Sequence, residues 1–166
     1  MNGKTLILNH EEIIQKIKRL AWEVYENNYQ RDAIVVIGIK ERGKVVADLL
    51  CEALADISKL KISKGYIELN ADHPQDSIIE AHEESLKGQS VILVDDVLNS
   101  GRTLMLATVP ILLQSPLALQ TVILADRDHK RFAISADYVG ISLATTLQEH
   151  LSFTQNEKGE FSVSLD

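Results

Sequence analysis

A run of aliphatic residues that ends in two adjacent carboxylates constrains this chain more than any other feature of its sequence. Residues 91–94 are followed by Asp95 and Asp96, and then by the polar turn at residues 99–103. An uninterrupted aliphatic run is typical of a strand buried on both faces of a parallel sheet. The apolar residues 104–113 that follow predict a helix. The segment therefore predicts a strand, a turn and a helix in succession.

The residues of this turn are suited to a phosphorylated sugar. Backbone N–H groups at the start of a helix carry partial positive charge and point outward, so they bind phosphate. Adjacent carboxylates at the end of a strand accept hydrogen bonds from a sugar diol. They also favour Mg²⁺, which takes oxygen ligands and arrives with the phosphates of a substrate. The alternative is a buried strand followed by an ordinary helix. In that case the free-energy cost of desolvating two carboxylates would serve no function.

The remaining pattern alternates strands with helices. Helical spacing of apolar residues predicts helices at residues 11–27 and 44–55, and a third begins near Thr103. Strands are predicted at residues 33–39, 60–69, 91–94, 121–125 and 138–141, and a hairpin in the tail from Leu151. Residues 70–88 are expected to form a loop with one helical turn around residues 78–85. This order predicts an α/β fold with a mainly parallel central sheet, whose ligands bind beyond the carboxyl ends of the strands.

A second group of functional residues follows the first of the long strands. The segment 38–44 nearly matches the phosphate-binding loop of nucleoside triphosphatases, in which Gly-Lys is followed by a hydroxyl residue. Position 45 is valine, so the Mg²⁺ ligand of such a loop is missing. The nucleoside triphosphatase interpretation also leaves residues 99–103 unexplained, so we do not favour it.

The segment 91–103 resembles the phosphoribosyl diphosphate (PRPP) motif of the type I phosphoribosyltransferases. The resemblance implies a single domain over residues 1–166, with a small hood beside the central sheet, and Mg²⁺ bound with PRPP rather than by protein ligands alone. It implies that Asp95 and Asp96 bind the ribose hydroxyls and, with Arg42, form the catalytic set. The 5′-phosphate would be bound by Asn99, Ser100, Gly101, Arg102 and Thr103, and the pyrophosphate by Lys40, Glu41, Arg42 and Gly43.

Within this superfamily, the chain is similar to the pyrimidine operon attenuation regulators that are also uracil phosphoribosyltransferases. The likeness extends to residues 124–130 and 136–140. It implies base binding by Tyr138, Val139 and Arg127, with PRPP, a pyrimidine base and its nucleoside monophosphate as partners. Asp126 stands where the hypoxanthine-guanine enzymes have lysine, which disfavours a purine. Family analogy also implies a homo-oligomer.

The composition of the chain favours some classes of protein over others. At 166 residues and 45 % hydrophobic content, the chain is of single-domain size with enough apolar residues for a core. The N-terminus has no signal-peptide pattern and no segment is long enough to span a membrane, so we expect a cytoplasmic protein. Cys51 is expected to be a buried small hydrophobic residue, and no histidine spacing predicts a zinc site. The net charge of −7 argues against RNA binding, which needs positive surface.

Two functions remain compatible with the sequence. The first is transfer of the ribose 5-phosphate of PRPP to a base, most simply uracil. The second is binding of PRPP or a nucleotide without turnover, as a regulator of pyrimidine metabolism. The second is favoured by Asn99, which stands where the pyrimidine regulators usually have tyrosine and the purine enzymes aspartate. It is also favoured by the segment 65–86, which carries six acidic residues and no lysine or arginine where a catalytic flap is expected. Carboxylates that close over an anionic substrate would repel it.

Overall fold

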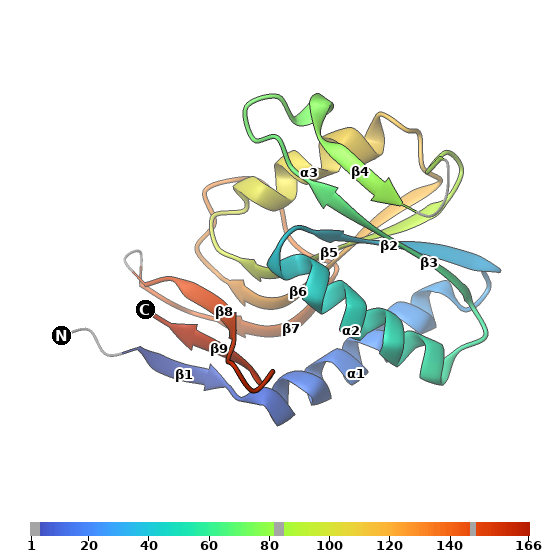
Figure 1. Ribbon diagram of the computed structural model, residues 1–166. Helices are drawn as coiled ribbons and strands as arrows, with labels where there is room; N and C mark the ends of the chain where they lie inside the picture. Colours follow the sequence, from blue (N-terminus) through green and yellow to red (C-terminus); the bar gives the residue numbers. More distant parts are fainter. Residues whose placement is uncertain (1–3, 82–84, 147–148) are drawn as a thin grey trace.

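The computed structural model describes residues 4–81, 85–146 and 149–166 of the chain. Within these ranges the largest layer is a six-stranded sheet in the order β4-β3-β2-β5-β6-β7 (Figure 1). Its neighbouring strands are parallel except for β3 and β4. The strands are β2 (Ala33–Ile39), β3 (Lys61–Glu68), β4 (Ile78–Ala81), β5 (Ser90–Leu98), β6 (Ala118–Arg127) and β7 (Tyr138–Leu143). The predicted α/β class with a mainly parallel central sheet is confirmed.

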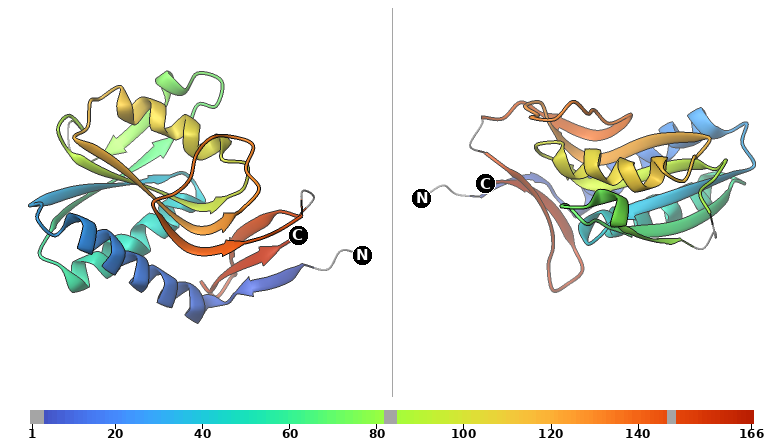
Figure 2. Two further views of the ribbon diagram at one scale, coloured as in Figure 1. Left: turned by 180° about the vertical axis from the view of Figure 1, so that it is seen from behind. Right: turned by 90° about the horizontal axis from the view of Figure 1, so that it is seen from above.

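Helices cover both faces of this sheet. The helices α1 (His10–Asn28) and α2 (Arg42–Ile57) pack on one face, and α3 (Arg102–Leu112) packs on the other (Figure 2). Successive residues of a strand point to opposite faces, so Ile34 and Val36 join the core beneath α1 and α2, whereas Val35 and Ile37 join the core beneath α3. The aliphatic runs of the sequence are explained by this double burial. Among the described residues, no helix is long and apolar enough to cross a membrane.

A second, smaller sheet stands at the carboxyl-end side of the central one, and we call it the hood. It consists of β1 (Thr5–Leu8), β8 (Leu151–Gln155) and β9 (Phe161–Leu165), which are antiparallel and ordered β1-β9-β8. The rings of Phe153 and Phe161 stack in its core. The turn of the hairpin has Gly159 at φ +82°, a conformation that glycine adopts without strain. The predicted hairpin is confirmed, while β1 has no counterpart among the predicted elements.

The segment between β3 and β5 differs from the prediction. Residues 78–81 form the strand β4, which pairs antiparallel with β3 at the edge of the sheet. The helical turn expected at residues 78–85 is therefore wrong for the part that the structure describes, and residues 82–84 lie outside the described ranges. The short helix of this segment is instead a 3₁₀ turn at Pro74–Asp76. Alternation in Ile78–Ala81 was too brief to distinguish a strand from a helical turn.

The central strand β5 is longer than the aliphatic run that predicted it. Its pairing with β2 ends at Val94, but its pairing with β6 continues from Asp95 to Leu98. The two carboxylates are therefore part of a strand that is paired on one side only. Because β2 and β3 lie on one side of this point and β6 and β7 on the other, the strand order reverses here. Open α/β sheets bind ligands in the crevice at such a reversal.

We predict that Gly140→Ala destabilises the fold, because β7 approaches β6 too closely for a side chain. A Cβ atom at position 140 would lie 2.3 Å from the carbonyl oxygen of Leu124, which cannot move without breaking the sheet. The free energy of unfolding, measured by urea denaturation, should fall by about 1–3 kcal/mol. Ser142→Ala, at an exposed position of the same strand, should change it by less than about 0.5 kcal/mol. Equal stabilities of the two variants would contradict this steric assignment.

Candidate active site

A cleft opens where β2 and β5 separate. Its volume is about 360 Å³, and it is bordered by Ile39, Lys40, Glu41, Arg42, Asp95, Asp96, Val97, Asn99, Thr103 and Leu151. The cleft therefore brings together the two groups of residues that the sequence singled out, although more than fifty positions separate them along the chain. The hood contributes Leu151 to its border.

The two carboxylates of the cleft are buried next to each other. Asp95 is 7 % exposed and Asp96 is 9 % exposed, and the backbone N–H of Asp96 donates to Asp95 Oδ1 at 2.9 Å. Burial raises the pKa of Asp95 well above its ordinary value, and the charge of Asp96 raises it further. Burial also raises the pKa of Asp96, against the opposing effects of its contact with Asp95 and the charge of Arg42. Keeping the two carboxylates ionised in this buried position is therefore unfavourable, and a cation or a hydrogen-bond donor bound beside them would reduce this cost.

Gly43 allows the start of α2 to approach this pair. A Cβ atom at position 43 would lie 2.8 Å from Asp95 Oδ1 and 2.9 Å from the carbonyl oxygen of Val94. The first turn of α2 can therefore lie directly against β5 only with glycine at this position. The N-cap residue Glu41 makes no side-chain capping hydrogen bond. The helix start, whose residues Glu41 and Arg42 border the cleft, therefore has no side-chain cap from Glu41, as a phosphate-binding helix start requires.

Lys40 is held by the acidic segment that the sequence placed near the site. Its ammonium lies 2.9 Å from a carboxylate oxygen of Glu80 and 3.5 Å from one of Glu68. The hydrogen bond to Glu80 is the largest cause of the raised pKa of Lys40. Of the acidic residues of this segment that the structure describes, these two therefore pair with Lys40. Lys64 is not positioned to close the cleft, since its ammonium pairs with Asp48 at 2.7 Å.

The turn at residues 99–103 forms a small pocket of about 100 Å³ next to the cleft. Asp95, Asn99, Ser100, Gly101 and Thr103 are among its lining residues. Gly101 has φ +85° and precedes the first turn of α3. The predicted 5′-phosphate residues therefore surround one pocket except for Arg102, whose side chain is exposed and lines neither space.

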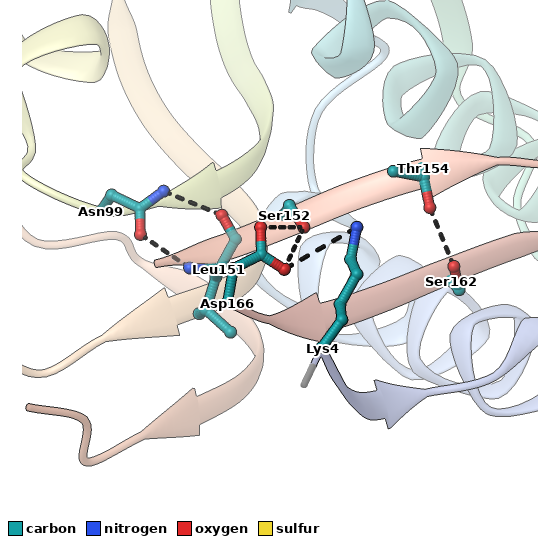
Figure 3. A network of polar contacts seen from close by, with 7 residues as sticks. All are labelled: Lys4, Asn99, Leu151, Ser152, Thr154, Ser162 and Asp166. Carbon is teal, nitrogen blue, oxygen red and sulfur yellow. Dashed lines mark hydrogen bonds and ion pairs between the residues drawn. The ribbon is translucent and has the colours of Figure 1, made fainter. Parts of the chain in front are cut away.

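Asn99 makes its side-chain contacts with the hood. Its Nδ2 donates to the carbonyl oxygen of Leu151, and its Oδ1 accepts from the N–H of the same residue, each at 3.1 Å (Figure 3). Both ends of the amide are therefore engaged by main chain that lies 52 residues away in the sequence.

A third space of about 610 Å³ lies next to the small pocket at residues 99–103. It is bordered by Asn99, Ser100, Arg127, Asp128, His129, Lys130, Arg131 and His150. Arg127 is thus beside it, as predicted for base binding. Tyr138 and Val139 are not: Tyr138, the first residue of the edge strand β7, pairs with Val122 of β6 and packs in the core. The carbonyl oxygen of Val139 accepts a hydrogen bond from Arg19 at 2.9 Å. The base-binding roles implied for these two residues therefore do not fit their positions.

The structure adds a buried ion pair that the sequence did not suggest. Lys130 Nζ lies 2.8 Å from one carboxylate oxygen of Asp126 and 3.0 Å from the other, and it donates to the carbonyl oxygen of Arg127 at 3.0 Å. Nearby, Arg127 Nε and Thr145 Oγ1 are buried without hydrogen-bond partners in the described part of the chain. The four-residue spacing of Asp126 and Lys130 could have signalled the pair, but only with knowledge that the chain turns back there.

Comparisons with known proteins agree with these observations. The model of the phosphoribosyl transferase domain matches residues 4–156. The Bifunctional protein PyrR of Clostridium acetobutylicum is 38% identical over 168 residues, covering 96% of this chain and 93% of that protein. Its counterpart in Clostridium botulinum (strain Alaska E43) is 34% identical over 175 residues, covering 99% and 97%. The solved hypoxanthine phosphoribosyltransferase of Trypanosoma cruzi is 20% identical, with a TM-score of 0.77, covering 96% of this chain and 95% of that one.

We predict that Asp95→Asn stabilises the empty protein at neutral pH. Since the folded-state pKa of Asp95 is raised, the native state binds more protons than the unfolded state. The contribution of Asp95 to the stability of the fold is therefore lost as the pH rises from the ordinary pKa of 3.8 through the raised pKa of the folded state. The asparagine variant should be about 1 kcal/mol more stable than the parent at pH 7.5 in urea denaturation. The advantage should disappear in acid.

The matched control for this measurement is Asp72→Asn, which removes an exposed carboxyl. Its stability should follow that of the parent at every pH. An Asp95→Asn protein that is less stable than the parent at pH 7.5 would contradict the assignment of Asp95 as an electrostatically costly group.

Proposed function

Since this chain belongs to the phosphoribosyl transferase domain family, we propose that it transfers the ribose 5-phosphate of PRPP to uracil and releases pyrophosphate. Membership in the family confirms the resemblance to type I phosphoribosyltransferases and the expected class of enzyme. One observation carries the proposal: a single cleft is bordered by Arg42, by Asp95 and Asp96, and by Thr103 of the turn at residues 99–103. These residues suit the pyrophosphate, the ribose and the 5′-phosphate respectively.

The proposed reaction is a substitution at the anomeric carbon. A ring nitrogen of uracil forms the new bond as the bond to the pyrophosphate oxygen breaks, and the nitrogen loses its proton to solvent. Pyrophosphate leaves with the bonding electron pair, so negative charge develops beside Arg42 and the start of α2. Positive charge develops on the ribose beside Asp95 and Asp96. Groups that face developing charge in a preformed arrangement lower the barrier.

The carboxylate pair also fits a role for Mg²⁺. Two buried carboxylates whose pKa values are raised by burial favour a nearby cation. Among the described residues, no three His, Cys, Asp or Glu side chains gather into a metal site. Mg²⁺ would therefore bind through the oxygens of PRPP together with Asp95 or Asp96, and would supply neutralisation of the pyrophosphate charge.

For the base, we propose the space beside Arg127 and Lys130. Uracil presents carbonyl oxygens on either side of an N–H group. Lys130 and Arg127 both border this space, and their side chains can donate to carbonyl oxygens.

The second candidate is a PRPP or nucleotide sensor without turnover. It is favoured by the contacts of Lys40, whose charge is neutralised by Glu68 and Glu80 rather than left for pyrophosphate. A site that binds the ribose phosphate but leaves the pyrophosphate poorly held would bind its ligand without driving its departure. The two candidates share Asp95 and Asp96 and differ in chemistry alone.

We predict that the protein forms uridine monophosphate and pyrophosphate from PRPP, Mg²⁺ and uracil. Asp95→Asn and Asp96→Asn should each lower kcat/KM at least about 100-fold, because each removes charge that faces the reacting sugar. Asp72→Asn should leave kcat/KM unchanged. If calorimetry shows that PRPP binds but no product forms, the sensor proposal replaces the transferase proposal. If the protein binds no phosphorylated ribose, both proposals are wrong.

We predict that Glu80→Gln strengthens PRPP binding. Loss of the carboxylate frees Lys40 for the pyrophosphate, and the exposed character of the pair limits the gain to about two- to fivefold in Kd. In a Lys40→Met background the same change should have no effect, so calorimetry on the four proteins forms a double-mutant cycle. Glu26→Gln, at an exposed position of α1, is the control. An equal gain with and without Lys40 would mean that Glu80 acts through general repulsion.

A further inference from the structure

The hydrogen bonds between Asn99 and Leu151 use a free strand edge. In the hood, β8 pairs with β9 so that His150 and Asp166 exchange both of their main-chain hydrogen bonds, each at 2.9 Å. In an antiparallel pair the next residue, Leu151, then directs its N–H and carbonyl groups away from the partner strand. Asn99 fills that edge with one donor and one acceptor (Figure 3). Its side chain takes the place of a neighbouring strand.

These two hydrogen bonds form a distinct connection between the hood and the central sheet. The other polar contacts of this end of the hood stay within it, such as Lys4 with Asp166 and Ser152 with Asp166. At its far side, Phe161 donates to His10 at the start of α1. In the described part of the chain, Asn99 is therefore the residue of the phosphate turn that hydrogen-bonds to the hood.

The position of β8 determines what borders both halves of the site. Leu151, which is 4 % exposed, lies at the border of the cleft, and its neighbour His150 lies at the border of the space beside Lys130. A shift of β8 would move both residues. The side-chain amide of Asn99 thus couples the turn at residues 99–103 to Leu151 and His150, which border the two spaces.

We propose that Asn99 is a positioning residue that fixes the hood over the ligand, rather than a direct ligand of the 5′-phosphate. Both ends of its amide are bound to Leu151, so the phosphate pocket is left to Ser100, Gly101, Thr103 and the start of α3. This role differs from the one that the sequence resemblance implied. It rests on the proposed function for its effect on ligands, but not for its effect on the hood itself.

Only an amide satisfies both groups of Leu151. Alanine would leave the buried N–H and carbonyl of Leu151 without partners, which is costly in the interior. Aspartate would keep an acceptor for the N–H but place an oxygen against the Leu151 carbonyl oxygen, and it would add negative charge beside the phosphate pocket. Asn99→Ala is therefore the cleaner test, and Asn99→Asp should be the more damaging of the two.

The first measurement needs no ligand. In Asn99→Ala, hydrogen exchange of the Leu151 amide, followed by NMR, should be at least about tenfold faster than in the parent. Exchange at Val163, within the same hood, should be unchanged. The matched control is Thr154→Val, which removes the 2.9 Å hydroxyl contact with Ser162 but leaves Asn99 in place. It should leave exchange at Leu151 unchanged.

The second measurement separates positioning from direct phosphate binding. Calorimetry should show that Asn99→Ala weakens uridine monophosphate about tenfold, while ribose 5-phosphate weakens less than about threefold, because only the former reaches the space beneath His150. An equal loss for both ligands would make Asn99 a phosphate ligand and overturn the proposal, as would unchanged exchange at Leu151. If the parent binds neither ligand, the proposed function fails while the exchange result still decides the structural role.

Discussion

The structure depends on the strand β5 losing one neighbour before the other. Its pairing with β2 stops at Val94, whereas its pairing with β6 continues to Leu98. The one-sided stretch holds Asp95 and Asp96 with the rigidity of a strand and yet gives them an open flank. A loop could present the same carboxylates but could not keep them fixed while they are desolvated. The opening between β2 and β5 also provides the volume into which the start of α2 projects.

The charged side chains around this opening interact with charged side chains from distant parts of the chain. The charge of Arg42 acts on Asp96 of β5, while Lys40 pairs with Glu68 and Glu80. These two cations, two positions apart in the sequence, thus interact with carboxylates from different elements. The acidic segment that seemed incompatible with an anionic substrate has a local use, because two of its carboxylates neutralise a lysine at the sheet edge rather than cover the sugar.

Local sequence predicted the parts of the fold that local physics controls. The aliphatic runs located β2, β5 and β6, and the helical spacing of apolar residues located α1 and α2. In each of these segments the order of apolar and polar residues reflects which faces are buried. The same strand pattern placed Asp95 and Asp96 directly after the aliphatic run, and the structure has them in the last part of β5. Two contacts that escaped prediction depend on distant partners: Asn99 binds Leu151, and the carbonyl oxygen of Val139 accepts from Arg19. The ion pair of Lys130 with Asp126 is close in sequence but depends on a turn of the chain between them. The pairing of β4 with β3 was equally invisible in a four-residue alternation.

The hood is assembled from segments near opposite ends of the sequence. The strand β9 lies between β1 and β8, and Thr5 is opposite Leu165 in the register. Contacts of such large sequence separation carry a high loop-closure entropy and form late in folding. The hood can therefore become ordered only after the segments on both sides of β9 have been brought together. Because Leu151 of β8 borders the cleft, part of the cleft wall depends on contacts that span nearly the whole described chain.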